Sequence, residues 1–113
     1  MTLEEIIKEI DNGNRIFVHC DTKEKAIKLL TTCKEKGYMW NGGSELLGKI
    51  DNYNGNWDIW LEDTVYFINN PIKRLIAFTS GEYCKGARIP FVYYKTEETP
   101  IIKSEYDISF LLN

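Results

Sequence analysis

The sequence predicts an α+β domain, with a mostly antiparallel sheet of about five strands and two helices packed on one face. Two segments near the N-terminus have the hydrophobic period of amphipathic helices. From residue 64 onward, β-branched and aromatic segments alternate with turn residues, which is typical of strands. The length of 113 residues suits one domain, so residues 1–113 are expected to fold as a single unit.

Residues 2–11 predict the first helix. Thr2 and Glu5 have the spacing of a capping box, in which each side chain binds the other residue's backbone amide. The apolar residues follow the i, i+3, i+4, i+7 rule at Leu3, Ile6, Ile7 and Ile10. Gly13 then allows the left-handed conformation in which many helices end.

A strand and a second helix follow. Residues 15–20 are β-branched and aromatic, and Asp21 with Glu24 predicts a further capping box at the start of a helix over residues 22–36. The side chains expected to be buried are Ala26, Ile27, Leu29, Leu30 and Cys33. Gly37 ends this helix.

Residues 38–40 predict the start of a strand in which Tyr38 and Trp40 share one face. The sequence "NGG" at 41–43 is typical of a turn. Residues 44–63 are expected to form an irregular connection with a helical turn at 44–49. So long a connection in a small domain indicates either a functional segment or regular structure that the pattern does not reveal.

The second half of the chain is expected to be mainly strands. Residues 64–69 and 74–79 predict a hairpin whose turn contains Pro71, and residues 80–88 predict a loop. Pro90 places the expected strand at 89–94 on an edge. The apolar segment at 106–112 is expected to dock on the body. An edge strand and an apolar tail are compatible with a symmetric dimer or a higher oligomer.

Composition bears on location and partners. The 14 basic and 17 acidic residues give a net charge of −3, which argues against a duplex nucleic-acid binder. Met1 precedes a capped helix, so no secretory signal is expected, and no apolar run approaches the roughly 20 residues of a membrane span. The three cysteines have no metal-ligand spacing, so they are expected to be reduced, with no metal or cofactor. The expected location is the cytoplasm.

No catalytic constellation is predicted. His19 and Cys20 are neighbours in a strand, so their side chains point to opposite faces. The acidic residues Asp58, Glu62 and Asp63 fit a solvated loop better than a metal or acid–base site. No glycine-rich phosphate loop is present.

The candidate binding residues are aromatic side chains, one asparagine and basic side chains near glycines. They are Tyr38, Trp40, Asn41, Tyr53, Trp57, Trp60, Arg74, Tyr83, Lys85 and Arg88. Two interpretations remain open for the aromatic members: core packing, or an exposed recognition surface. Lys85 and Arg88 flank Gly86, and Arg74 follows Lys73, so an anion could bind at either place.

The stretch "FVHCDTKEKAIKLLTTCKEKGYMWNGG", residues 17–43, resembles a unit found in small phage and prophage proteins of low-GC Gram-positive bacteria. "TVYFIN" and "LIAFT" are similar to the hairpin of the same group. The resemblance covers about 80 residues, and its motifs are a cap, a helix stop and an aromatic strand. No ligand-binding motif of the group is matched.

The resemblance implies an inhibitor of bacterial immunity, because that group includes anti-CRISPR proteins and anti-Thoeris sponges. The leading hypothesis is a non-enzymatic inhibitor that binds a host defence protein, such as a CRISPR effector, stoichiometrically. The first alternative is a sponge for a cyclic nucleotide signal, with Trp40, Trp57 or Trp60 stacking on the base and Arg74 or Arg88 binding phosphate. The second is a prophage accessory or structural module without a direct defence target.

Overall fold

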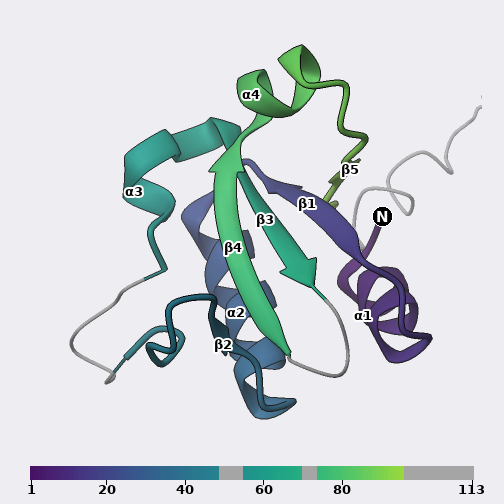
Figure 1. Ribbon diagram of the computed structural model, residues 1–113, viewed down its shortest axis with the longest axis vertical. Coiled ribbons are helices and arrows are strands. Elements are labelled where there is room, and N and C mark those ends of the chain that lie inside the picture. Colours follow the sequence, from purple (N-terminus) through teal and green to yellow (C-terminus); the bar gives the residue numbers. More distant parts are fainter. Residues whose placement is uncertain (49–54, 70–73, 96–113) are drawn as a thin grey trace, which may run out of the picture.

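The computed structural model describes residues 1–48, 55–69 and 74–95. The elements are α1 (Leu3–Asp11), β1 (Ile16–Cys20), α2 (Lys23–Glu35), β2 (Met39–Trp40), α3 (Trp57–Trp60), the 3₁₀ helix η1 (Leu61–Asp63), β3 (Thr64–Asn69), β4 (Leu75–Ser80), α4 (Gly81–Gly86) and β5 (Val92–Tyr93). Figure 1 shows their arrangement around one sheet. The predicted α+β class is confirmed.

The sheet is mixed, so the prediction of a mostly antiparallel sheet is wrong. The strand order is β2-β4-β3-β1-β5. β3 pairs antiparallel with β1 and with β4, whereas the edge strands β2 and β5 pair parallel with their neighbours. The reason lies in the connections: α2 lies between β1 and β2, and α4 lies between β4 and β5. A crossover of this kind returns the chain in its original direction.

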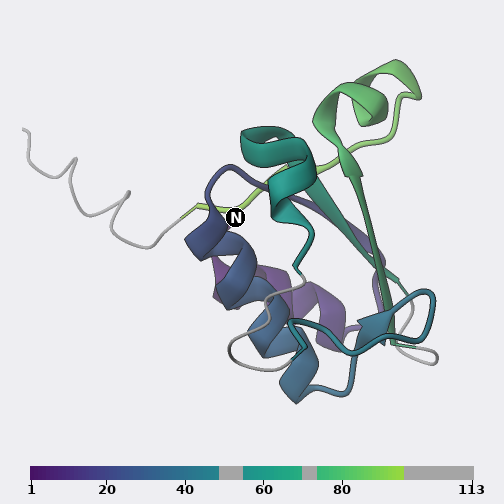
Figure 2. The same cartoon turned by 90° about the vertical axis from the view of Figure 1, so that its left-hand side faces the viewer.

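One face of the sheet forms the core with the two longer helices. Val18 of β1 and Tyr66 of β3 are paired across the sheet and fully buried. Ile6 of α1 and Leu29 of α2 belong to the same buried cluster. Figure 2 shows α1 and α2 on the same side of the sheet. Each such side chain contributes roughly 1.5–3 kcal/mol when it leaves water.

The helix starts agree with the sequence in one case and differ in the other. The hydroxyl of Thr2 accepts the amide of Glu5 at 3.3 Å, and Glu5 accepts the amide of Thr2 at 2.9 Å, which confirms the capping box of α1. The cap of α2 is Thr22, which accepts the amide of Lys25 at 3.2 Å. The prediction that Asp21 caps α2 is therefore wrong. Its carboxylate instead pairs with the ammonium of Lys25 at 2.7 Å.

Three predicted segments are corrected. Residues 44–48 contain no helical turn, and the helical residues of that connection lie in α3 and η1. The expected loop at 80–88 contains α4, and the expected strand at 89–94 is only Val92–Tyr93. Ile27 of α2, expected in the core, is 38% exposed.

Several predictions lie outside the described residues. These are the hairpin turn with Pro71 and the docking segment at 106–112. Within the described ranges, no helix has the length and apolar character needed to cross a membrane.

The buried hydroxyl of Tyr66 provides a stability test. It donates to the carbonyl of Gly55, two residues before α3. Tyr66→Phe would leave that buried carbonyl without its partner, so we expect the free energy of unfolding to fall by about 1–3 kcal/mol. Urea denaturation measures it. Tyr83→Phe, at a residue that is 60% exposed, is the matched control and should change stability by less than about 0.5 kcal/mol. Equal effects of the two changes would contradict the assignment.

Candidate functional site

The elements that the sequence left irregular gather at one end of the sheet. α3 and η1 lead into β3, and α4 follows β4. The strands β3 and β4 are antiparallel neighbours. The start of one strand lies beside the end of the other, so these short helices lie at the same end of the molecule (Figure 1).

Three consecutive apolar side chains at this end face solvent. Ile59 is 58% exposed, Trp60 is 46% exposed and Leu61 is 47% exposed. We call these three residues the α3 surface. Monomeric proteins expose single apolar side chains commonly but contiguous groups less often, and such groups are typical of interaction sites.

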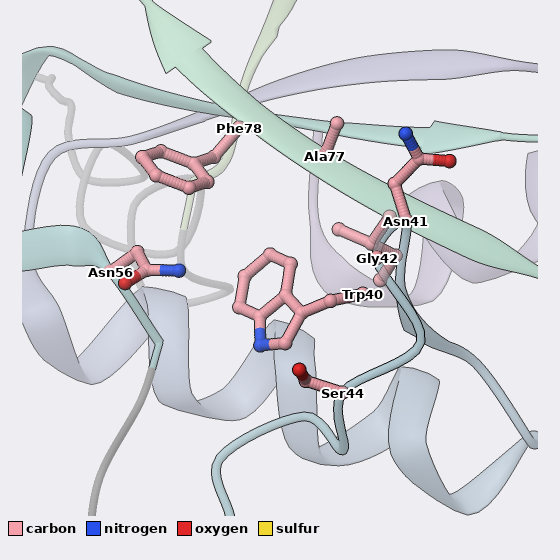
Figure 3. A pocket seen from close by; sticks show the side chains of 8 residues that line it. Trp40, Asn41, Gly42, Ser44, Asn56, Ala77 and Phe78 are labelled. Carbon is pink, nitrogen blue, oxygen red and sulfur yellow. The ribbon is translucent and has the colours of Figure 1, made fainter.

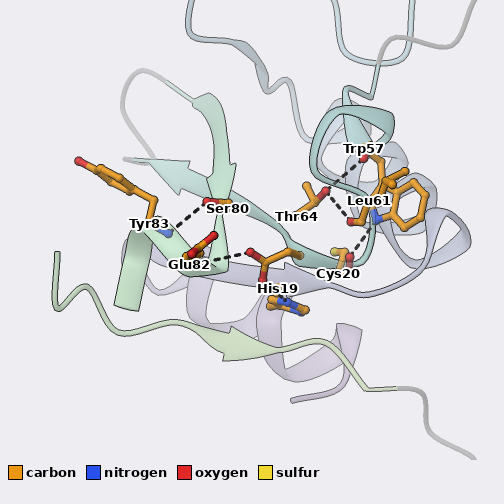
Figure 4. Close-up of polar contacts among 9 residues, drawn as sticks. His19, Cys20, Trp57, Leu61, Thr64, Ser80, Glu82 and Tyr83 are labelled. Atoms are coloured by element: carbon orange, nitrogen blue, oxygen red, sulfur yellow. Dashed lines mark hydrogen bonds and ion pairs between the residues drawn. The ribbon is translucent and has the colours of Figure 1, made fainter. Parts of the chain in front are cut away.

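Hydrogen bonds to neighbouring strands fix the α3 surface in place (Figure 4). The indole N–H of Trp57 donates to the carbonyl of Cys20 in β1, with a distance of 2.9 Å. The hydroxyl of Thr64 lies 2.7 Å from the carbonyl oxygen of Leu61 and 3.2 Å from that of Trp57. Trp57 is therefore an anchor, and the exposed residues after it occupy a defined position.

The backbone at Leu61 is strained. Its φ is 53° and its ψ is −131°, a combination that L-residues other than glycine rarely adopt. Strain of this kind costs on the order of 1–3 kcal/mol, and it concentrates at functional sites.

Asp63 links this end of the molecule to the rest of the sheet. Its Oδ2 accepts the amide of Glu82 at 2.9 Å, and its Oδ1 lies 3.4 Å from Nε2 of His19. A Cβ on Gly81 would lie 2.4 Å from Asp63 Oδ1, so glycine is required for this approach. Ser80 is the N-cap of α4 and accepts the amide of Tyr83 at 3.1 Å, so Ser80 and Asp63 together bind two amides of its first turn. This explains why a glycine-containing segment is helical.

A cavity of about 380 Å³ lies between β4, the segment at residues 40–44 and Asn56, the residue before α3. It is lined by Trp40, Asn41, Gly42, Ser44, Asn56, Ile76, Ala77 and Phe78. Figure 3 shows the Trp40 indole among the surrounding side chains of Phe78, Asn56 and Ser44. We call it the Trp40 pocket.

The thiols are held in their neutral form. Burial raises the pKa of Cys33 to about 12 and also raises the pKa of Cys20. The pKa of Cys84 is raised by burial and by the negative charge of Asp63. Since the thiolate is the nucleophilic form, these cysteines are not activated for catalysis. Among the described residues, no group of three metal-ligating side chains is present.

The structure separates the predicted binding residues. Tyr38 and Trp40 are buried, so they belong to the core and not to an exposed surface. Burial raises the pKa of the Tyr38 phenol. Trp57 is half-buried and Trp60 is exposed. Tyr53 lies outside the described residues.

The polar and basic candidates are dispersed. Asn41 is exposed and lines the Trp40 pocket. Arg74 lies near the opposite end of β4, where its guanidinium donates to the carbonyl of Lys36. Tyr83, Lys85 and Arg88 are exposed on and after α4. In Figure 4, Tyr83 extends away from Leu61 and Trp57, so it is not part of the α3 surface.

Ile59 and Leu61 were missed as candidates, although a signal was present. The sequence "IWL" at 59–61 lies between Asp58 and Glu62. Three consecutive apolar residues in a helical turn cannot all face one core, because successive side chains point about 100° apart. At least one of them had to be exposed.

No protein-family model, curated protein or solved structure matches this chain.

The strain at Leu61 generates a paired prediction. Leu61→Gly relieves a backbone conformation that glycine adopts freely, so we expect the free energy of unfolding to stay the same or to rise by up to about 2 kcal/mol. Ile59→Gly, two residues away in α3, should lower it by about 1 kcal/mol, because glycine is a poor helix former. Urea denaturation of both variants measures the difference, and a larger loss from Leu61→Gly than from Ile59→Gly would refute the strain.

Proposed function

We propose that this protein is a non-enzymatic binding protein that engages another protein stoichiometrically through the α3 surface. The observation that carries the proposal is the exposure of Ile59, Trp60 and Leu61 on a segment held by hydrogen bonds. Tryptophan is enriched among the residues that dominate interface energy. A fixed apolar group also loses little conformational entropy when it binds.

Charge around the α3 surface favours a partner with basic groups at its rim. Asp58 and Glu62 are exposed on either side of the three apolar residues. Asp58 is paired with the ammonium of Lys23 at 3.1 Å. The chain as a whole carries a net charge of −3. Complementary charge of this kind accelerates association and selects partners more than it increases affinity.

The biological setting is proposed from the sequence. The resemblance of residues 17–43 to small phage and prophage proteins supports an inhibitor of bacterial immunity that acts in the host cytoplasm. Its partner would be a defence protein such as a CRISPR effector. A homodimer remains part of this proposal from the sequence alone. The outward backbone groups of the edge strands are already bonded, those of Trp40 to Ser44 and Gly43, and the carbonyl of Tyr93 to the N-terminal amine of Met1.

The cyclic-nucleotide sponge ranks second. The Trp40 pocket favours a small ligand, but neither Arg74 nor Arg88 lines it. The stacking tryptophan and the phosphate-binding arginine that a sponge would need therefore do not line the same pocket. A prophage accessory module is the third candidate, and no specific contact in the described residues favours it.

Binding by a Trp60 variant tests the proposal. Trp60→Ala removes an exposed side chain, so the fold should be retained, and affinity for the partner should fall at least about tenfold. The partner is sought among purified CRISPR effector complexes, and the complexes are measured by native mass spectrometry and calorimetry at defined stoichiometry. Ile27→Ala, at an exposed apolar residue of α2, is the matched control and should bind like the unmodified protein.

Three outcomes would contradict the proposal. The first is an effector complex that Trp60→Ala and Ile27→Ala weaken equally. The second is the failure of every effector to bind. The third is chemical conversion of the effector complex by an amount of this protein far below one molecule per complex, which would indicate an enzyme.

A further inference from the structure

The Trp40 pocket has the composition of a small-ligand site, and the proposed function does not use it. Its volume of about 380 Å³ is in the range of ligand pockets, near the small end. Such sites combine aromatic walls with a few convergent polar groups.

The walls are aromatic and nearly perpendicular. The Trp40 and Phe78 rings have their centroids 5.9 Å apart and an interplanar angle of 68°. Trp40 is 7% exposed, so its ring is fixed by core packing. Its indole N–H is buried and has no hydrogen-bond partner. A flat ring placed in this corner would contact one aromatic face and one aromatic edge.

Polar side chains with unused hydrogen-bonding groups complete the lining. Within the part of the chain that the structure describes, the side chains of Asn41, Ser44 and Asn56 make no hydrogen bond. Asn56 is the clearest case, since it precedes α3 as its cap but makes no capping bond. Its φ of 59° is left-handed, a conformation that asparagine tolerates better than most residues.

The edge of β4 supplies a further donor and acceptor. β2 pairs with β4 only at Leu75 and Ile76, and the amide of Asn41 donates to the carbonyl of Ile76 at 2.9 Å. Edge-facing backbone groups recur at every second residue of a strand. The N–H and C=O of Phe78 therefore face the same edge, beside the pocket and beyond the end of β2. Together they present one donor and one acceptor side by side.

The charge of the lining restricts the ligand. All eight lining residues are uncharged at neutral pH. A phosphate in the pocket would lack the cationic partners that usually bind it. A neutral ring that carries its own donor and acceptor would satisfy the polar groups without burying a charge.

We propose that the Trp40 pocket binds an uncharged planar heterocycle with adjacent hydrogen-bond donor and acceptor groups, of which a nucleobase or nucleoside is the chemical class that fits. The ring lies against Trp40 and Phe78 in the corner that they form. Its donor–acceptor edge meets the backbone of Phe78, and the Asn56 amide binds a second edge. This site is independent of the α3 surface.

The test uses the intact chain with adenine, guanine, adenosine and AMP as probes. Ligand-detected NMR and thermal denaturation report binding, because a ligand specific for the native state raises the midpoint temperature. We expect at least one base or nucleoside to bind with a dissociation constant below about 1 mM. AMP should bind no more tightly than adenosine.

Asn56→Gly removes the amide but keeps a residue that accepts the left-handed backbone. It should weaken binding of the same probe about tenfold. Arg88→Gly makes the same type of change at a φ of 60° away from the pocket, and it should leave binding unchanged. Asn41→Ala, at an exposed residue, should also weaken binding and guards against a local folding effect of the first variant.

The failure of every probe to bind would overturn the inference. So would equal binding by Asn56→Gly and the unmodified protein, or tighter binding of AMP than of adenosine. The α3 surface is tested separately, because Trp60→Ala should leave base binding intact.

Discussion

The carboxylate of Asp63 is the contact on which the arrangement of the functional end depends. One oxygen accepts the amide of Glu82 in the first turn of α4, and the other lies beside the buried His19 of β1. A single side chain therefore joins η1 to two elements that are distant in the sequence. Gly81 lets the backbone approach, because a Cβ there would meet the carboxylate. Without this junction, α4 would lose an amide partner and η1 would lose one of its contacts with β1. Helices this short do not form alone in water, so such tertiary contacts determine whether they exist.

The same reasoning explains why apolar side chains remain in solvent. Hydrophobic burial alone would turn Trp60 or Leu61 inward. Instead the indole of Trp57 occupies the inward position and its N–H bonds to β1, while Thr64 holds the carbonyl of Leu61. These bonds offset the backbone strain at Leu61. The result is an apolar group that is already ordered before any partner arrives, which reduces the entropy lost on association.

The sequence predicted the elements whose causes are local. The capping box of α1 and the strand at 64–69 depend on residues that are neighbours in the chain, and both are present. The mixed sheet could not be predicted in this way, because its parallel edges depend on where α2 and α4 return the chain. α4 was missed in part for a related reason: its N-cap Ser80 is local, but Asp63, which accepts the amide of Glu82, lies 19 residues from it. Trp40, Trp57 and Trp60 show the limit most clearly. Composition left core packing and an exposed surface both open, and tertiary packing assigns one indole to the core, one to an anchor and one to solvent.

The short segment from Asn56 to Leu61 belongs to both proposed sites. Asn56 lines the Trp40 pocket, and Trp60, four residues later, lies on the α3 surface. Between them, Trp57 is bonded to the carbonyl of Cys20. A ring bound by Asn56 would restrict the start of α3, and a partner bound at Trp60 would restrict its end. Trp57 and Thr64 already hold this segment, so each event would leave little conformational freedom for the other to remove, and the coupling between the two sites should be small. Linkage makes that effect equal in both directions. The anchor at Trp57 sets its size, since a segment that is already rigid has little freedom left to share.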